Sequence, residues 1–456
     1  MGNVLAKYLR PTAAEDKRPL PPAIAHFPLG ELPAELRSKV YKHVQSHGIA
    51  TMREVSLVCH EWYQAFFPIV YETIELEAYR RDEEDSISPR SPIDEFTVLS
   101  WIHVLRSLPH ISSVARSLVL KGPTSTRSCS MVIRGVAISA PRLSLCLLAA
   151  LLECLPSITN IHLKHIMWEP CRTIHGDPHR AHREWPRTSL STLQLSYIQC
   201  TYPDIAHPLM ATTLFQSVDE LIIEDIEGTE SEQLDLPNLD IKHMCIMRSD
   251  RDSRYLSNAF YSCIPENSLQ ALHIHDFTYG DIHLVTPLIF RHADSLVRLH
   301  LSFISQIDLQ LPVLWSILGI VECKALREFA IKINIHSRSP SHFRDMFDLL
   351  TSVLQNINSN ITKLEIWFDL AHTVSLVGVQ VLSLEGWSEI NDICRRFHDL
   401  THFTMGFTYR EYPRRAREKS VRLDSSSERR LFRVLPFLQS LDKANISFLA
   451  ELRYAM

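Results

Sequence analysis

One spacing of apolar residues recurs along most of this chain of 456 residues and limits the folds that it can adopt. Three apolar residues stand at positions 0, +3 and +5, and the last two flank a single residue, as on one face of a β-strand. Nine such units begin at Ile158, Leu190, Val218, Ile241, Leu269, Leu296, Leu326, Ile361 and Leu400. A weaker tenth unit begins at Ala115. The chain therefore reads as a series of similar strands.

The segments between these units have the apolar spacing of helices. Phe343, Phe347 and Leu350 are one example, because residues three and four apart share one side of a helix. The intervals are irregular, from 23 residues between Val218 and Ile241 to 39 residues between Ile361 and Leu400. Strands that alternate with helices favour an α/β fold, with parallel strands on one face and helices on the other.

The segment before the repeats predicts two helices and a strand. Pro33 suits the first position of a helix, since its missing N–H would have no partner there, and this helix should end before Gly48. Thr51 and Glu54 have the spacing of a capping box that opens a second helix, which Pro68 should end. The β-branched run 69–76 then reads as a strand and as the first element of the repeat domain.

Three blocks in this segment carry a resemblance to a known family. They are Leu32-Pro33-x-Glu35-Leu36, then Ser56-Leu57-Val58-Cys59-His60-x-Trp62, then Tyr71 before a strand. In order and spacing they resemble the F-box, a helical motif that binds the Skp adaptor of cullin-based ubiquitin ligases. His60 departs from the family's usual Arg or Lys. The resemblance implies an adaptor-binding face made of Leu32, Pro33, Leu36, Val40, Val58, Cys59 and Trp62. Alternatively, these residues only pack a helical hairpin that caps the next domain.

The repeats resemble divergent leucine-rich repeats, with one systematic departure. Position +8, where such repeats carry Asn or Cys, is apolar here, namely Ile166, Ile198, Ile226, Phe277 and Ile304. Fungal F-box proteins with irregular repeats are the nearest resemblance, and it implies an irregular leucine-rich-repeat-like solenoid. We expect a flexible arm at 1–25, an F-box-like module at 26–76, a charged connecting loop at 77–100 and the repeat domain at 101–456.

The residues between the apolar positions of each strand should face away from the helices. This alternation places His273 and His275 beside Arg298 and His300 on neighbouring strands. Trp367 belongs to the same face, and an exposed aromatic residue is a frequent hot spot of protein interfaces. We predict that a client protein binds to these five residues, although an ordinary solvated sheet face remains the alternative.

The sequence offers little support for catalysis or for a cofactor. It contains no GxGxxG, GxxxxGK, GxSxG or HExxH motif, and only 12 glycines. The histidines and the cysteine between His165 and His182 do not match a standard zinc spacing, and arginines among them would oppose a bound cation. We interpret that segment as a loop without metal. The basic segment from Arg410 to Arg433 is a nuclear-import signal, a site for an acidic partner or a solvated loop.

The net charge and the cysteines limit which partners and which compartment we expect. The net charge is only −5, which does not favour nucleic acid or a membrane surface as a partner. The ten cysteines show no CxxC pair, and those such as Cys146 and Cys154 fall on apolar faces, where a thiol behaves as a small hydrophobe. We predict a reducing compartment, the cytoplasm, with the nucleus as the alternative. The expected function is a non-enzymatic adaptor that binds the Skp adaptor and a client, and the alternative is a scaffolding repeat protein.

Overall fold

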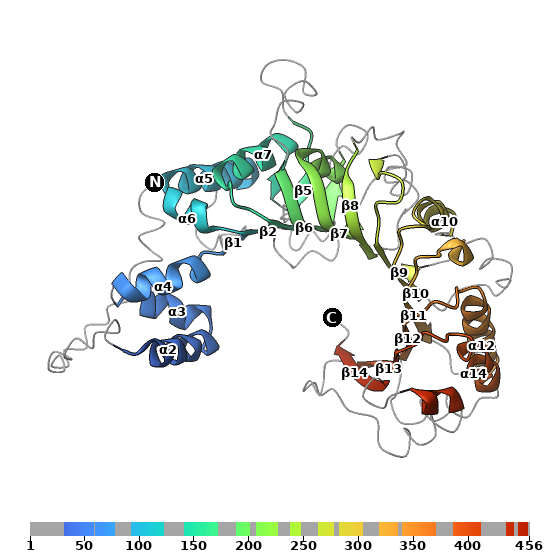
Figure 1. Cartoon of the computed structure of the whole chain (residues 1–456). Coiled ribbons are helices and arrows are strands. Elements are labelled where there is room, and N and C mark those ends of the chain that lie inside the picture. The colour runs from blue at the N-terminus through green and yellow to red at the C-terminus, as the bar shows by residue number, and fades with distance from the viewer. Residues whose placement is uncertain are drawn as a thin grey trace. The chain divides into compact units, whose positions relative to one another are not determined.

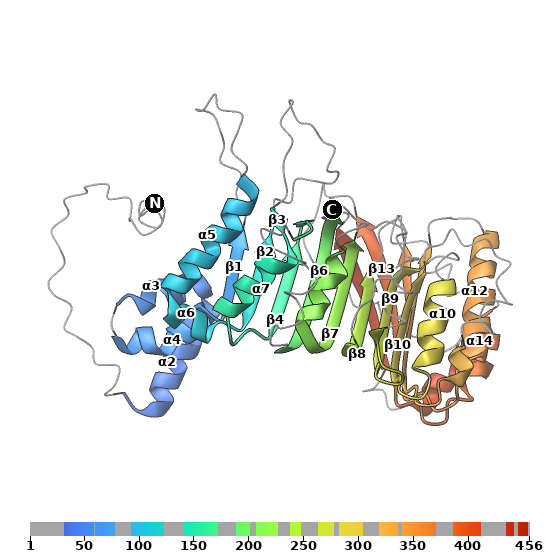
Figure 2. The ribbon, with the colours of Figure 1, turned by 90° about the horizontal axis from the view of Figure 1, so that it is seen from above.

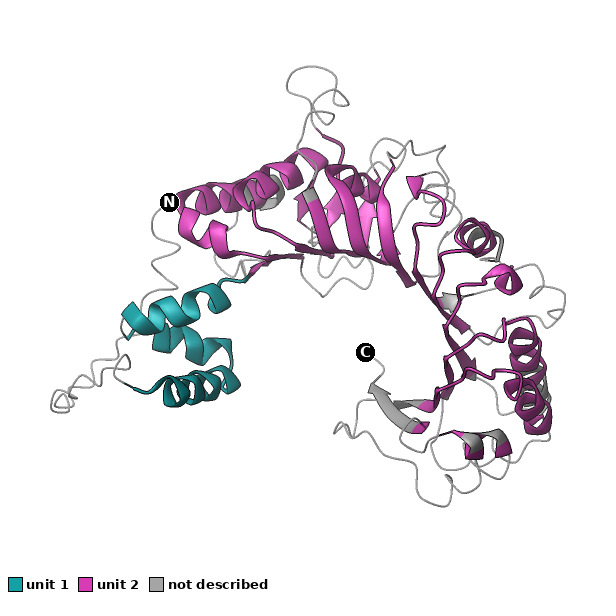
Figure 3. Cartoon of the chain, viewed as in Figure 1, with its two compact units in different colours: residues 1–72 teal, residues 73–456 magenta. Residues whose placement is uncertain are grey.

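The computed structural model describes most of the chain from residue 32 onward. The described ranges are 32–58, 60–77, 93–122, 141–171, 188–200, 207–226, 238–247, 263–277, 282–303, 319–335, 340–370, 386–411, 435–441 and 446–454. The chain divides into two compact units, residues 1–72 and residues 73–456, which Figure 3 shows in different colours. Each unit is described by itself below.

The described part of unit 1 consists of three helices (Figure 1). Helix α2 spans Ala34–Ser46, α3 spans Ile49–Ser56 and α4 spans His60–Val70. Pro33 is the residue before α2 and not its first helical residue, one position from the expectation. Gly48 precedes α3 with a φ of 92°, a backbone conformation that a side chain would strain. The glycine thus permits the tight connection between the first two helices.

Two details of the expected second helix are wrong. The Thr51–Glu54 capping box does not form, because α3 begins at Ile49 and Thr51 already lies inside it. The Thr51 hydroxyl instead donates to the His47 carbonyl at 3.4 Å. The single helix that was expected to end at Pro68 is two helices, α3 and α4, and Pro68 lies inside the second one.

The core of unit 1 is small and largely aromatic. Met52, Phe66 and Val70 are buried. The Trp62 ring stacks on Phe66 with centroids 5.2 Å apart, and it meets Tyr41 edge-on at 5.4 Å. Both arrangements are favourable for aromatic pairs. This cluster ties α2 to α4, and it leaves much of the apolar surface of the unit uncovered.

Unit 2 contains one fourteen-stranded sheet. Its main path runs β1 (Thr73–Glu77), β2 (Ser117–Lys121), β4 (Asn160–Lys164), β6 (Thr188–Cys200), β7 (Phe215–Ile226), β8 (Asp240–Met247), β9 (Ala271–Phe277), β10 (Arg298–Phe303), β11 (Glu328–Ile335), β12 (Lys363–Leu370), β13 (His402–Glu411) and β14 (Ile446–Tyr454). Off this path, the short strand β3 (Arg142–Leu143) pairs with β5 (Met167–Trp168), and β5 pairs with β6. The described strand pairs are parallel, in the order of the sequence.

The first strand begins later than the sequence suggested. The expected strand 69–76 overlaps the end of α4, and β1 starts only at Thr73. It pairs with β2 and belongs to unit 2.

The 0, +3, +5 spacing sets the register of the whole sheet. Position +3 of each unit lies beside position +3 of the next, as for Leu193 beside Leu221, and position +5 does the same. These side chains are buried in nearly every unit. Burying a Leu or Ile side chain contributes roughly 1.5–3 kcal/mol to the free energy of unfolding. The two apolar rows therefore form the centre of the core.

Helices cover one face of this sheet, as Figures 1 and 2 show. They are α5 (Ile93–Ser107), α6 (Pro109–Val114), α7 (Leu145–Cys154), α10 (Ile282–Arg291), α12 (Pro340–Gln355) and α14 (Trp387–Cys394), with short 3-10 helices η3 (Pro208–Leu214), η5 (Ile320–Glu322) and η7 (Pro436–Ser440). The α/β class with parallel strands is therefore confirmed. Helix α5 begins inside the segment 77–100 that was expected as a connecting loop.

Three consecutive units share a kink that explains the apolar +8 position. His165, Tyr197 and Asp225 stand at position +7 and have φ values of 54°, 54° and 47°. A left-handed residue turns the chain, so that the next side chain points back into the core instead of away from it. The following residues, Ile166, Ile198 and Ile226, are indeed buried. Phe277 has no described side-chain position, and Ile304 lies outside the described residues.

None of the helices in the described ranges is long and apolar enough to cross a membrane.

Candidate functional site

Unit 1 carries a concentration of exposed apolar side chains. Leu36, Ile49, Leu57, Val58 and Tyr63 are all exposed, with Leu57 at 81% and Val58 at 73% of their full surface. Helix α2 has no buried residue along its described length. Large exposed apolar surfaces on small units often mark interaction sites. We refer to these five residues as the apolar surface of unit 1.

Two of the residues expected to bind the Skp adaptor belong to this surface. Leu36 lies in the first turn of α2 and is 47% exposed. Val58 lies between α3 and α4, where its N–H donates to the Val55 carbonyl at 3.0 Å. Leu57, Ile49 and Tyr63 were missed, because a spacing pattern shows which apolar residues share a face and not which face stays uncovered.

The other expected adaptor-binding residues lie in different surroundings. Leu32 and Val40 are half-buried, and Pro33 is exposed at the start of α2. Trp62 packs into the aromatic core of unit 1 and is only partly exposed. Cys59 lies outside the described residues. Trp62 therefore contributes to the stability of the unit, whatever it contacts in a partner.

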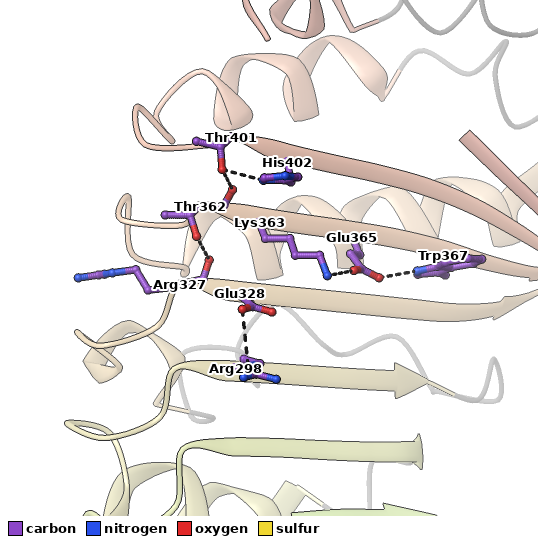
Figure 4. Close-up of polar contacts among 9 residues, drawn as sticks. All are labelled: Arg298, Arg327, Glu328, Thr362, Lys363, Glu365, Trp367, Thr401 and His402. Atoms are coloured by element: carbon purple, nitrogen blue, oxygen red, sulfur yellow. Dashed lines mark hydrogen bonds and ion pairs between the residues drawn. The ribbon is translucent and has the colours of Figure 1, made fainter. Parts of the chain in front are cut away.

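One face of the sheet in unit 2 is covered by none of the described helices (Figures 1 and 2), and we call it the helix-free face. There the strand register brings three of the expected client-binding residues together. His300 pairs with His273 across β9 and β10. The ring centroids of His273 and His300 are 5.5 Å apart, and those of His275 and His300 are 5.2 Å apart. The predicted proximity of these histidines is confirmed. Arg298, on the same strand as His300, forms an ion pair with Glu328 at 3.6 Å (Figure 4).

Burial favours the neutral form of two of these histidines. Burial, followed by the neighbouring His275 and His273, lowers the pKa of His300 to about 3. Burial is also the main cause of the lowered pKa of His273. Since an imidazole with a pKa of about 3 carries no charge at neutral pH, the His300 ring presents hydrogen-bonding and aromatic surface rather than positive charge.

Trp367 is half-buried, although the sequence suggested an exposed side chain. Its indole lies against the α-carbon of Gly406 on the next strand, where a Cβ would overlap the ring. Its Nε1 donates to Glu365 at 3.1 Å, and Glu365 also forms an ion pair with Lys363 at 2.7 Å (Figure 4). Burial acts to raise the pKa of the Glu365 carboxyl, but the bonds from Lys363 and Trp367 outweigh it and lower that pKa. The indole is therefore held in place as a rigid platform.

Beside this platform, the sheet contains a buried ion pair. Lys332 Nζ lies 3.2 Å from Asp369 Oδ2, and both side chains are almost completely buried. The alternation along β11 suggested a solvent-exposed Lys332, and the structure corrects this. Charges removed from water are stable only when they are paired, so each of these residues depends on the other.

The remaining candidate segments lie mostly outside the described residues. Of the segment from His165 to His182, the structure describes residues up to 171, and of the basic segment from Arg410 to Arg433 it describes only Arg410 and Glu411. Within the described ranges, no group of three His, Cys, Asp or Glu side chains is arranged to hold a metal ion.

Neither a scan against models of protein families nor a search of curated protein sequences finds a match to this chain. The fold defines an α/β protein with a large parallel sheet and a separate small helical unit. Its candidate sites are two surfaces: the apolar surface of unit 1, and the helix-free sheet face around His300 and Trp367.

Proposed function

We propose that this chain is a non-enzymatic adaptor of a Skp-cullin-F-box type ubiquitin ligase. In this proposal unit 1 is an F-box-like module that docks the Skp adaptor. Unit 2 is an irregular leucine-rich-repeat-like solenoid that holds a client protein, and catalysis resides in other subunits of the ligase. The exposed apolar surface of unit 1 is the observation that carries the proposal.

Two features of unit 1 support docking. Leu36 and Val58, which the F-box resemblance assigns to the adaptor-binding face, are exposed rather than used for the core of the unit. Helix α2 buries none of its residues, although it is thirteen residues long. A helix of this length usually gains most of its stability by packing an apolar face, so a partner that covers Leu36 and Val40 would complete it.

The sheet of unit 2 supports the second half of the proposal. Its strands follow one another in sequence order and pair in parallel, which is the arrangement expected of a leucine-rich-repeat-like array. The helix-free face presents the histidines on β9 and β10 and the fixed indole of Trp367 on β12, with β11 between them. Aromatic side chains that are already held in place lose little entropy on binding, which favours them as anchors for a client.

Co-purification of the full chain with the Skp adaptor tests the proposal. The wild-type chain should retain the adaptor, and the Leu36→Asp and Val58→Asp variants should lose it. Val321→Asp is the matched control, because Val321 is 53% exposed and lies on η5 in unit 2. If the wild-type chain does not retain the adaptor, or the unit 1 variants retain it as well as the control does, the alternative of a scaffolding protein replaces the proposal.

A further inference from the structure

Two cysteines that are distant in sequence meet at one corner of unit 2. Cys146 is the second residue of α7, and Cys171 follows the short strand β5. The Cys146 backbone N–H donates to Cys171 Sγ at 3.3 Å, and the two side chains are also hydrogen-bonded to each other. Both residues are half-buried, and neither forms a disulfide in the structure. The two cysteines thus lie next to each other.

The start of α7 gives the two sulfur atoms different surroundings. The first backbone N–H groups of a helix have no partner inside it. Here the Ser144 hydroxyl accepts the N–H of Leu147 at 3.4 Å, and Cys171 Sγ accepts that of Cys146. A negatively charged sulfur at this position would face the positive end of the helix. For Cys146, burial, followed by its contact with Cys171, raises the pKa of the thiol to about 12.

The corner that carries the two thiols is held by contacts between β3 and β5. Arg142 Nη1 forms an ion pair with Glu169 Oε1 at 2.9 Å. The Glu169 N–H donates to the Leu143 carbonyl at 3.0 Å. Arg142 and Leu143 lie just before α7, and Glu169 lies just before Cys171 in the sequence. These bonds therefore hold together the two segments that carry the cysteines.

We propose that Cys146 and Cys171 form a reversible disulfide, with Cys171 as the attacking thiol and Cys146 as the resolving thiol. Glutathione disulfide serves as the oxidant. The Cys171 thiolate attacks one sulfur of glutathione disulfide and releases one glutathione thiolate, which leaves a mixed disulfide on Cys171. The Cys146 sulfur then attacks Cys171 and releases the second glutathione. Two protein thiols are oxidised, one glutathione disulfide is reduced, and the two thiol protons end on the two glutathione molecules.

The arrangement predicts the order and the relative rates of these steps. Redox-sensitive pairs combine an attacking thiol with a resolving cysteine next to it. The second step should be the slower one, because a thiol with a pKa of about 12 is seldom ionised at neutral pH. The disulfide would join positions 25 residues apart, the first turn of α7 and the exit of β5.

Differential alkylation of the full chain tests the proposal. The chain is incubated with excess glutathione disulfide, free thiols are blocked with iodoacetamide, and peptides are mapped by mass spectrometry without reduction. We expect one cross-linked peptide pair that contains Cys146 and Cys171, and its loss after addition of reduced glutathione. The Cys146→Ser variant should accumulate the mixed glutathione disulfide on Cys171.

Cys154→Ser provides the control. Cys154 lies on the same helix and is also half-buried, but its thiol donates to the Ala150 carbonyl at 3.3 Å. This variant should form the same cross-link as the wild type. Two results would overturn the proposal: both cysteines still react with iodoacetamide after oxidation, or Cys171 is linked to another residue such as Cys200. This outcome is independent of whether unit 1 binds the Skp adaptor.

Discussion

The Val58→Asp substitution separates a docking surface from a merely exposed one. Val58 is 73% exposed in the chain alone, and its backbone N–H is paired with Val55. The substitution therefore removes no core contact. Replacement of an exposed residue away from the core usually changes the free energy of unfolding by no more than about 0.5 kcal/mol. The variant should thus fold with nearly the stability of the wild type.

The expected loss of binding follows from the exposed area. Full burial of a Val side chain contributes roughly 1.5–2 kcal/mol, and about three quarters of it remains to be buried by a partner. A carboxylate moved into that apolar contact without a partner adds a desolvation cost of several kcal/mol. A total of at least about 3 kcal/mol corresponds to a loss of affinity of more than about 100-fold.

Isothermal titration of the full chain with the Skp adaptor measures this loss, and urea unfolding monitors the fold. Val321→Asp repeats the same chemistry at an exposed site of unit 2 and should change neither quantity. Trp62→Ala provides the opposite control, because it removes a ring that stacks on Phe66 and should lower the stability of unit 1. An affinity of Val58→Asp within a few-fold of the wild type would refute the assignment of Val58 to the docking surface.

Three further predictions concern the stability of unit 2. The His292 side chain is completely buried, and burial lowers its pKa to about 4. The unfolded chain binds a proton at this histidine near pH 6.5, so the free energy of unfolding should fall as the pH drops from 6.5 toward 4. The expected loss is roughly 2.5 kcal/mol at pH 4.5. His292→Leu should remove this share of the pH dependence in urea unfolding measured at pH 7 and pH 4.5. Lys332→Met should cost about 3–5 kcal/mol, because it leaves the buried Asp369 carboxylate without its ion pair, and adding Asp369→Leu should recover much of the loss in a double-mutant cycle. Gly406→Ala should destabilise the sheet by about 1–3 kcal/mol, because the added Cβ would overlap the Trp367 ring. In a Trp367→Ala background, the same Gly406→Ala substitution should lower the melting temperature much less.

The sheet could be predicted from the sequence because its signal is local and repeated. In a strand, side chains alternate between two faces, so positions +3 and +5 must share a face in every unit. Aligning these positions also fixes the register, and Leu193 does pair with Leu221. The same alternation placed His273 beside His300 correctly, because it needs no knowledge of distant contacts.

Other features could not be predicted because their causes lie elsewhere in the chain. The half-buried position of Trp367 depends on Gly406 in the next strand, and the buried position of Lys332 depends on Asp369. The pairing of thiols at the start of α7 joins residues that no motif connects. In unit 1 the apolar spacing continues through Leu57 and Val58, so it could not reveal that the helix breaks there and leaves both side chains exposed.

Hydrogen–deuterium exchange of the full chain, with and without the Skp adaptor, tests the central claim most directly. The account predicts that the adaptor slows exchange in Ala34–Ser46 and at the α3–α4 junction around Val58, because a partner that covers these elements also suppresses their local opening. Exchange in β9–β13 should not change without a client. Unchanged exchange in unit 1 at saturating adaptor, or slowed exchange confined to unit 2, would contradict the account.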